Sequence, residues 1–400
     1  MSDAKQVIIK GEADEATIRQ AENCLVEAEA MLLMADSHRG YGMPIGGVAV
    51  YRDRVPPSAV GFDIGCGNKA VRTNLMLDDI EGRLDPLADE IFERIAFGVG
   101  GANPTPVEHE LFDDPAWDEV EFLAGSPALK DTARAQLGST GAGNHYVDVF
   151  VDEDDSIWVG VHFGSRGFGN SVASHFMELA GDELNIMDQT PKTLAVDSDP
   201  GRDYIRCMKL AGRYAYAGRD WVCETVVGIL GGEITDEVHN HHNYAWYEEH
   251  GGEHFWVVRK GATPAFPGQR GFVGASMGDD SVILEGIDSE ESRRLFYSTV
   301  HGAGRVMSRT QAAGRRRRVR TRRTRPDGST YGYTEWVHDG GLVDFDAVKD
   351  RIMEQGIVLR GASADEAPEV YKDLAEVLEA HAGTVEIRRT LSPLIVCMAD

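Results

Sequence analysis

Five short motifs between residues 63 and 305 constrain this chain most, because each combines glycine or asparagine with a side chain that binds metals or phosphates. The first, Asp63-Ile64-Gly65-Cys66-Gly67-Asn68, sets a carboxylate and a thiol three residues apart. The others are Gly143-Asn144-His145, the segment 162–167 (HFGSRG), His241-His242-Asn243 and the segment 301–305 (HGAGR). These groups are typical of a metal site that acts on phosphate esters. We therefore expect the chain to fold so that the five motifs meet.

Hydrophobic periodicity predicts both helices and strands. Helical spacing is found in residues 14–36, 170–187, 202–230 and 366–381. Strand patterns are found in glycine-punctuated runs between 40 and 75, in a hairpin at 145–163, and at 254–259 and 384–397. Because the motifs fall in every third of the chain, we expect an α+β fold. It would be a single mixed domain, 1–400, with loops that converge on a central metal site.

The composition indicates a protein of the cytoplasm. No segment reaches the roughly 18 uninterrupted apolar residues of a membrane span, and the first residues lack the features of a secretory signal. The five cysteines are odd in number and widely spaced, which argues against a disulfide framework. We expect no membrane partner, a cytoplasmic location and a Cys66 that is free to act as a thiolate.

The charge of the chain is unevenly distributed. A formal net charge of -26 argues against general attraction to nucleic acid. Residues 315–325, RRRRVRTRRTR, nevertheless hold eight of the 40 Lys and Arg residues. Such a run is typical of a solvated segment, so we expect a basic, mobile loop at 313–331. Its position just after the segment 301–305 equally favours local phosphate binding, and both interpretations stay open.

The residues alone suggest a metal centre without identifying it. Thiolate, carboxylate and imidazole groups are all competent ligands, and a glycine-rich loop can point Asp63 and Cys66 the same way. A buried cysteine more often only packs, and a single histidine more often serves the structure. The softness of the ligands suits zinc as well as manganese.

The segment 301–305 suggests a nucleophile. A neutral imidazole can attack the phosphorus of a nucleotide while divalent ions offset the phosphate charge. His301 is followed by Gly302, Ala303 and Gly304, whose backbone N–H groups can approach a phosphate closely, and Arg305 adds a positive charge. On its own, a histidine before such glycines is more often part of an ordinary loop.

Nine motifs in fixed order carry a resemblance that runs nearly from end to end. They occupy residues 36–50 (DSH and GYGMPIGGVAV), 60–68, 141–149, 161–170, 239–246, 259–268, 275–278, 301–309 and 364–373. In this order they resemble the RtcB family of RNA ligases.

The resemblance implies the RtcB-like fold and a centre with two Mn²⁺ ions, in which Cys66 is a bridge. Its further ligands would be Asp63, His145, His162 and His242. His239 and His241 compete for the last role, and the pair His242-Asn243 matches the family's His-Asn element best. His301 would take GMP from GTP as a covalent phosphoramidate.

The resemblance also implies a GTP site. Its residues would be Asn144, Tyr146, Asp148, Ser276, Ser281, Gly302, Ala303, Gly304, Arg305 and Tyr371, with Arg166 and Lys260 as groups that position phosphates or RNA ends. Asp148 stands where the family has a glutamate, and it can accept hydrogen bonds from guanine. Family members typically finish in Lys-Gly, whereas no lysine follows Lys372 here.

The function implied is that of a GTP-dependent RNA ligase in RNA repair or tRNA splicing. It would join 3'-phosphate or 2',3'-cyclic phosphate ends to 5'-hydroxyl ends. Its partner would be RNA, and an activating helper protein is a second partner compatible with this function. The alternatives are a metal-dependent cyclic phosphodiesterase, a non-catalytic protein that binds RNA ends, and a relative specialised in repairing cleaved tRNA or ribosomal RNA.

Overall fold

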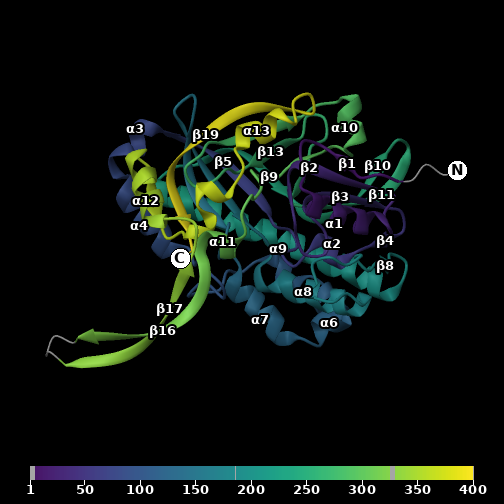
Figure 1. Cartoon of the computed structure of the whole chain (residues 1–400), viewed down its shortest axis with the longest axis horizontal. Helices are drawn as coiled ribbons and strands as arrows, with labels where there is room; N and C mark the ends of the chain where they lie inside the picture. Colours follow the sequence, from purple (N-terminus) through teal and green to yellow (C-terminus); the bar gives the residue numbers. More distant parts are fainter. Residues whose placement is uncertain (1–4, 185, 325–328, 400) are drawn as a thin grey trace.

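The computed structural model describes residues 5–184, 186–324 and 329–399. Helices and several sheets alternate along the chain, and a two-stranded ribbon projects from the body (Figure 1). The mixed α+β class expected from periodicity is confirmed. Within the described residues, no helix is long and apolar enough to cross a membrane.

The larger sheet has the strand order β13-β14-β19-β6-β7-β5-β9, with β18 paired to β19. Strands β6 and β7 are the two arms of the hairpin that the sequence predicts, and β19 is the expected closing strand. The strands are β5 (Gly67–Met76), β6 (Tyr146–Asp152), β7 (Ser156–Phe163), β9 (Ile234–His241), β13 (Arg270–Val273), β14 (Ser281–Gly286), β18 (Val358–Arg360) and β19 (Val385–Met398).

A second sheet has the order β1-β2-β3-β11-β10. Its strands are β1 (Ile8–Ile9), β2 (Ala30–His38), β3 (Ile45–Tyr51), β10 (Asn243–His250) and β11 (Glu253–Lys260). Two short pairs, β4 (Arg54–Val55) with β8 (Leu194–Ala195) and β12 (Ala262–Pro264) with β15 (Ser298–Val300), complete the body.

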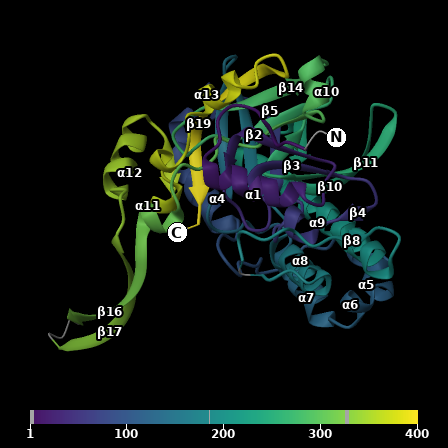
Figure 2. The same ribbon diagram turned by 45° about the vertical axis from the view of Figure 1, so that its right-hand side comes forward.

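The helices cover the sheets (Figure 2). They are α1 (Glu15–Leu25), α2 (Pro57–Val60), α3 (Leu77–Ile80), α4 (Leu84–Arg94), α5 (Ala116–Glu119), α6 (Glu121–Ala124), α7 (Pro127–Gln136), α8 (Arg166–Ala180), α9 (Asp199–Leu230), α10 (Glu290–Arg294), α11 (Arg309–Ala313), α12 (Phe345–Glu354) and α13 (Leu374–Glu379). Short 3-10 turns lie at Glu81–Arg83, Glu110–Asp113, Ala364–Glu366 and Pro368–Val370.

Alternation along the strands divides the core. On β2, Leu33 packs with α1, α8 and α9, whereas Leu32 packs against residues of β13 and β14. On the other side of the larger sheet, Val222 and Val226 of α9 pack against β5, β6 and β7. Strand β2 of the second sheet is therefore buried on both faces, and the face that carries Leu32 packs against the larger sheet.

The helix expected at 14–36 is wrong in its second half. Asp14 caps α1 by accepting from the backbone N–H groups of Ala16 and Thr17, but the helix ends at Leu25 and residues 30–38 form β2. This strand is buried on both faces, so its apolar residues form a continuous run without alternation. Such a run cannot be told from a buried helix by periodicity.

Two other helices also differ from expectation. The segment 366–381 contains the turn Pro368–Val370 before the short helix α13, because Asp373 caps a new helix after the turn. The helix expected at 170–187 begins earlier, at Arg166, and ends at Ala180 before the left-handed Gly181.

The basic segment expected as a loop at 313–331 is largely a strand. Residues 314–324 form β16, which pairs antiparallel with β17 (Thr330–Gly340). Residues 325–328, and with them the end of the arginine run, lie outside the described residues. Arginines interspersed with the β-branched residues Val319, Thr321 and Thr324 are compatible with a solvated two-stranded ribbon as well as with a loop.

Candidate metal centre and nucleophile

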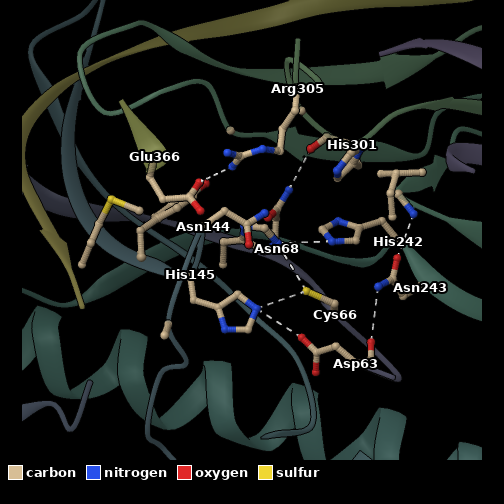
Figure 3. A pocket seen from close by; sticks show the side chains of 18 of the residues that line it. Asp63, Cys66, Asn68, Asn144, His145, His242, Asn243, His301, Arg305 and Glu366 are labelled. Atoms are coloured by element: carbon tan, nitrogen blue, oxygen red, sulfur yellow. Dashed lines mark hydrogen bonds and ion pairs between the residues drawn. The ribbon is translucent and has the colours of Figure 1, made fainter. Parts of the chain in front are cut away.

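A cavity of about 880 Å³ lies where the two sheets meet (Figure 3). The five motifs that contain Asp63, His145, His162, His242 and His301 all contribute residues to its lining. Its lining includes the expected site residues Asp63, Cys66, Asn144, His145, Tyr146, Asp148, His162, Arg166, His242, Ser276, His301, Gly302, Ala303, Gly304, Arg305 and Tyr371. The volume suits a nucleotide.

The cluster of metal-binding side chains follows from strand register. Gly67, the first residue of β5, pairs with Phe163 at the end of β7 and with His241 at the end of β9. Cys66, His162 and His242 are the immediate neighbours of these residues, so they meet at one edge of the sheet. His145 joins them because it precedes Tyr146, which pairs with His162.

The donor atoms of this cluster lie within ligand distance of one another. The Sγ atom of Cys66 is 3.3 Å from Nε2 of His162 and 3.7 Å from Nε2 of His145. The Nε2 atom of His162 is also 3.3 Å from Nε2 of His242. On the other side, Nε2 of His145 is 3.1 Å from Oδ2 of Asp63. Cys66 thus stands between two groups of donors.

Burial controls the protonation of these groups. It raises the pKa of the Cys66 thiol well above its ordinary value, and the charge of Asp63 adds to this. Burial, with His145 and His301 adding to it, lowers the pKa of His162 well below its ordinary value. Burial also lowers the pKa of His242, and His301 adds to this effect. Neutral imidazoles offer lone pairs, but the thiol must lose its proton to bind a cation.

The residues fit a metal ion. Sulfur and nitrogen atoms bound to one ion at about 2.0–2.3 Å lie some 3.3–3.8 Å apart. The distances from Cys66 to His145 and His162, and from His162 to His242, fall in this range. Cys66, His145 and His162 alone form a buried group with donor atoms within 4.8 Å of one another. Lone-pair atoms held this close repel unless a cation or a proton lies between them.

The loop around Cys66 is fixed by close packing. A Cβ atom at Gly164 would lie 2.2 Å from Oδ1 of Asp63, so only glycine lets this carboxylate take its place. The backbone N–H of His242 donates to the carbonyl of Cys66 at 2.8 Å. Asn243 donates to the carbonyl of Asp63 and accepts from the N–H of Gly261, which ties the loop to the second sheet.

Arg219 of α9 stabilises the loops that carry the donor cluster by hydrogen bonds. This fully buried residue of α9 donates to the carbonyls of Gly65 and Phe163 and, through Nε, to Nε2 of His239 at 2.9 Å. His239 and His241 alternate with Asn240 on β9 and face α9, so neither lines the cavity. Of the three histidines, only His242 is brought to the donor cluster.

His301 lies beside the donor cluster, with its ring oriented by Asp36. Both Nδ1 and the backbone N–H of His301 donate to Oδ2 of Asp36, at 2.6 and 3.0 Å. Burial of Asp36 would raise its pKa, but the charge and hydrogen bonds of His301 hold the pKa below its ordinary value. The ring packs edge-on against His242, with centroids 4.9 Å apart. The Nε2 lone pair therefore remains available on the side away from Asp36.

Other side chains complete this wall of the cavity. Asn68 donates to the carbonyl of His301 at 3.4 Å and to that of Phe272. Arg305 is held by Glu366 at 3.0 Å and by the hydroxyl of Tyr371 at 3.2 Å. A Cβ atom at Gly304 would lie 2.1 Å from the carbonyl of Asp36, and its φ is +79°, so the loop after His301 depends on this glycine.

Asp148 lies at the apolar end of the cavity. Val396 and Met398 of β19, Met277 and Tyr146 line the cavity with it. Its Oδ1 accepts from the backbone N–H of Cys397 at 3.3 Å. Burial raises the pKa of Asp148 well above its ordinary value despite this hydrogen bond. A carboxyl group so placed has acceptor capacity left for a ligand.

Two expected residues do not line the cavity. Ser281 is buried behind the wall, where its hydroxyl accepts from the N–H of Ala275. Lys260 turns its Nζ atom to the carbonyls of Tyr41 and Ser58. Burial lowers the pKa of Lys260 to about 8. Both side chains support neighbouring loops.

Residue patterns alone missed several groups. Asp36, Asn68, Arg309 and Glu366 all contact or line the site, although no role was expected for them. Each lies in one of the nine motifs that carry the family resemblance, and this is the only signal that could have found them. Their partners come from distant parts of the chain.

A histidine held in one tautomer beside a cluster of metal-binding groups suits an enzyme that transfers nucleotidyl or phosphoryl groups. The sequence model of the family described as tRNA-splicing ligase RtcB matches residues 18–335. The RNA-splicing ligase RtcB of Escherichia coli (strain K12) is 32% identical, over 98% of this chain and 95% of the relative. The tRNA-splicing ligase RtcB of Thermococcus kodakarensis is 29% identical, over 98% and 92%. The chain belongs to the RtcB family and is an RNA ligase.

Replacing Cys66 tests the metal centre. Cys66→Ala removes the donor atom that stands between the two groups, so bound metal per chain should fall below the wild-type value and ligation should cease. Elemental analysis after dialysis measures the metal. Cys207→Ala, at a fully buried thiol in α9, is the matched control and should keep the wild-type metal content. Equal metal content in both variants would contradict the role of Cys66.

Proposed function

We propose that this RNA ligase joins RNA 3'-phosphate or 2',3'-cyclic phosphate ends to 5'-hydroxyl ends, with GTP and two Mn²⁺ ions, in RNA repair or tRNA splicing. One observation carries the proposal: the Asp36 carboxylate holds Nδ1 of His301 at 2.6 Å, while the ring packs against His242 of the donor cluster. This leaves a single nucleophilic nitrogen next to candidate metal ligands.

The ligands of the two ions would be Asp63, Cys66, His145, His162 and His242, with Cys66 shared. Bound there, Mn²⁺ ions would offset negative charge on the phosphates and on departing pyrophosphate. Manganese rather than zinc is proposed from family membership, because the donor set suits both metals.

The first step would be guanylylation of His301. Its Nε2 atom attacks the α-phosphorus of GTP, the N–P bond forms, and the bond to the pyrophosphate oxygen breaks. The Nδ1–H group of His301 keeps its hydrogen bond to Asp36, and the negative charge of Asp36 stabilises the positive charge that develops on the ring. Gly302, Ala303 and Gly304 leave room for the phosphates beside the loop, and Asn144 and Arg166 also line the cavity.

The later steps would return His301 to its free form. An oxygen of the RNA 3'-phosphate attacks the phosphorus of the bound GMP, and the N–P bond breaks. The 5'-hydroxyl then loses its proton and attacks the activated 3'-phosphate, so that the new phosphodiester forms and GMP leaves. Where the RNA ends in a 2',3'-cyclic phosphate, water would first attack its phosphorus. The bond from phosphorus to the 2' oxygen would break, which leaves a 3'-phosphate and a 2'-hydroxyl.

Guanine would bind at the apolar end of the cavity. The carboxyl group of Asp148 can accept from the ring N1–H and the exocyclic amine of guanine, which adenine cannot match. Tyr146, Met277 and Met398 provide apolar surface for the base. Ser276 and Tyr371 would contact the nucleotide, and Ser281 would act only through the loop of Ala275.

The nucleophile can be tested with GTP labelled at the α-phosphate. Wild-type protein with Mn²⁺ should gain an acid-labile, alkali-stable label, and His301→Ala should gain none while it keeps its bound metal. His254→Ala, on the exposed part of β11, is the control and should be labelled normally. A labelled His301→Ala protein would mean that another residue is the acceptor.

The orienting role of Asp36 has its own test. Asp36→Asn keeps the shape but presents an amide that can donate to Nδ1, which favours the wrong tautomer of His301. We expect the rate of guanylylation to fall by about a hundred- to ten-thousand-fold, with GTP binding unchanged. Single-turnover labelling and equilibrium binding separate the two effects. A rate within a few-fold of wild type would sink the assignment.

Base selectivity can be tested at Asp148. Asp148→Asn places a donor beside the donors of guanine, so GTP affinity should fall by about 1 to 3 kcal/mol, while ATP affinity should not fall. Asp148→Glu, which restores the family's residue, should keep the preference for GTP. Titration of both nucleotides at fixed Mn²⁺ measures this. An unchanged GTP-to-ATP ratio in Asp148→Asn would place the guanine elsewhere.

A further inference from the structure

Strand β2 contains a bulge where it carries Asp36. Its pairing with β3 stops at Leu33 and resumes at His38, so residues 34–37 stand opposite Gly46 alone. Within the described residues, neither β3 nor β1 pairs with this segment. We call residues 34–37 the Asp36 bulge. Bulges often lie next to active sites and redirect a side chain, but the backbone that leaves the ladder must then be held by other groups.

The bulge packs tightly against β3 at Gly46. The φ of Gly46 is +75°, and a Cβ atom there would lie 2.7 Å from Cα of Ser37 and 2.8 Å from Oδ1 of Asp36. Only glycine fits at this position. Close packing therefore fixes one side of the bulge, and Asp36 is fully buried within it.

Two side chains from the C-terminal part of the chain bind the backbone of the bulge. The Nζ atom of Lys372 donates to the carbonyl of Ala35 at 2.7 Å and to that of Ser37 at 3.4 Å. The N–H of Ala35 donates to Nε2 of His381 at 3.4 Å. Buried backbone polar groups need partners, and β3 does not pair with these residues. Lys372 and His381 thus replace a neighbouring strand around Asp36.

The same two residues contact the chain on both sides of His301. The backbone N–H of Lys372 donates to the carbonyl of Gly304 at 2.9 Å. The Nδ1 atom of His381 lies 3.4 Å from Oγ1 of Thr299, two residues before His301. Burial lowers the pKa of His381 to about 4, so its ring is neutral, and Nδ1 carries the hydrogen because Nε2 accepts one. Both residues therefore join the bulge to the segment that carries His301.

Lys372 also places a positive charge near Asp36. Oδ2 of Asp36 accepts both hydrogen bonds from His301, while its buried Oδ1 has no hydrogen-bond partner in the described part of the chain. A buried carboxylate is costly unless opposite charge or donors offset it. Burial lowers the pKa of Lys372, and the negative charge of Asp36 acts against that effect. The two charges therefore attract each other, which favours the ionised form of Asp36.

We infer that Lys372 and His381 are positioning residues for the guanylylation step, because they hold the Asp36 carboxylate against Nδ1 of His301. The inference rests on the proposed function, since it takes His301 as the group that receives GMP. Neither Lys372 nor His381 is among the described residues that line the cavity. Both act on guanylylation through Asp36 and make no contact with GTP.

Lys372→Met removes the ammonium group and keeps the apolar stem. In single-turnover labelling, its rate should fall by about ten- to a hundredfold, because small displacements of a reacting group reduce the rate steeply. GTP affinity and bound metal should stay at wild-type values. Lys5→Met is the matched control, since Nζ of Lys5 donates to the carbonyl of Ala28 at 2.7 Å, before β2 begins.

The control should be labelled at the wild-type rate. A rate for Lys372→Met within about twofold of wild type would overturn the role of Lys372. An equal loss in Lys5→Met, or a matching loss of GTP affinity and metal in Lys372→Met, would overturn it as well, because both results indicate a general effect on the fold.

A double-mutant cycle decides whether Lys372 acts through Asp36. Asp36→Asn already removes the charged acceptor that Lys372 is inferred to hold in place. In that background, Lys372→Met should lower the labelling rate by no more than about twofold, since the two changes affect one interaction. A loss as large as in the wild-type background would mean that Lys372 acts by another route, and the inference would fail.

His381 is tested by two substitutions at one buried position. His381→Gln keeps an acceptor for the N–H of Ala35 and a donor for Thr299, whereas His381→Leu keeps neither. The leucine variant should be labelled about tenfold more slowly than wild type, with GTP affinity unchanged, and the glutamine variant should recover most of the rate. Equal rates in the two variants would overturn the role of His381.

A proton resonance separates this inference from the proposed function, because it needs no GTP. The Nδ1–H group of His301 donates to Asp36 at 2.6 Å, and so short a hydrogen bond should give a signal far downfield that Asp36→Asn abolishes. Lys372→Met and His381→Leu should shift or broaden this signal, and Lys5→Met should leave it unchanged.

The two failures are then distinct. If wild-type protein gains no label, the proposed function fails, yet the resonance still decides whether Lys372 and His381 hold the contact between Asp36 and His301. If His301 is labelled but neither the rate nor the resonance responds to Lys372→Met and His381→Leu, the inference fails and the proposed function stands.

Discussion

The candidate site depends on the antiparallel register of β7, β5 and β9. Gly67 pairs with Phe163 on one side and with His241 on the other, so Cys66, His162 and His242 reach one edge of the sheet together. A slip of one residue would turn every side chain of a strand to the opposite face and scatter the donors. Arg219 secures this register from within α9, because it donates to the carbonyls of both Gly65 and Phe163. A buried guanidinium thus stabilises the donors without contacting the cavity.

The two walls of the cavity come from different sheets. The donor cluster belongs to the larger sheet, whereas Asp36 lies near the end of the second sheet's β2 and holds His301, which follows β15. Asn243 joins the walls, since it contacts both Asp63 and Gly261. The distance between nucleophile and donors is therefore set by how the sheets pack, through a core shared by Leu32, Val273 and Leu284. Core substitutions far from the cavity can alter chemistry by this route.

Much of the fold followed from local patterns, and the rest required tertiary information. The hairpin of β6 and β7 was predictable because alternating apolar residues flank the acidic turn Asp152 to Asp155. Strand β2 was not, because burial on both faces removes the alternation. The convergence of Cys66, His145, His162 and His242 was expected from their chemistry and from the family resemblance, but Asp36 was given no role. Its function exists only through the contact with His301, which lies 265 residues later.

The chain enters and leaves the ribbon of β16 and β17 at neighbouring positions. Gly314 stands directly opposite Gly340, and within the described residues β16 and β17 form a sheet of their own. A chain entering and leaving at adjacent points can be shortened, lengthened or exchanged with little strain on the body. The ribbon is thus a module that can diverge in length and charge while the strands that carry the donors stay unchanged. Changes in the ribbon and changes in the donor cluster can in this way occur independently.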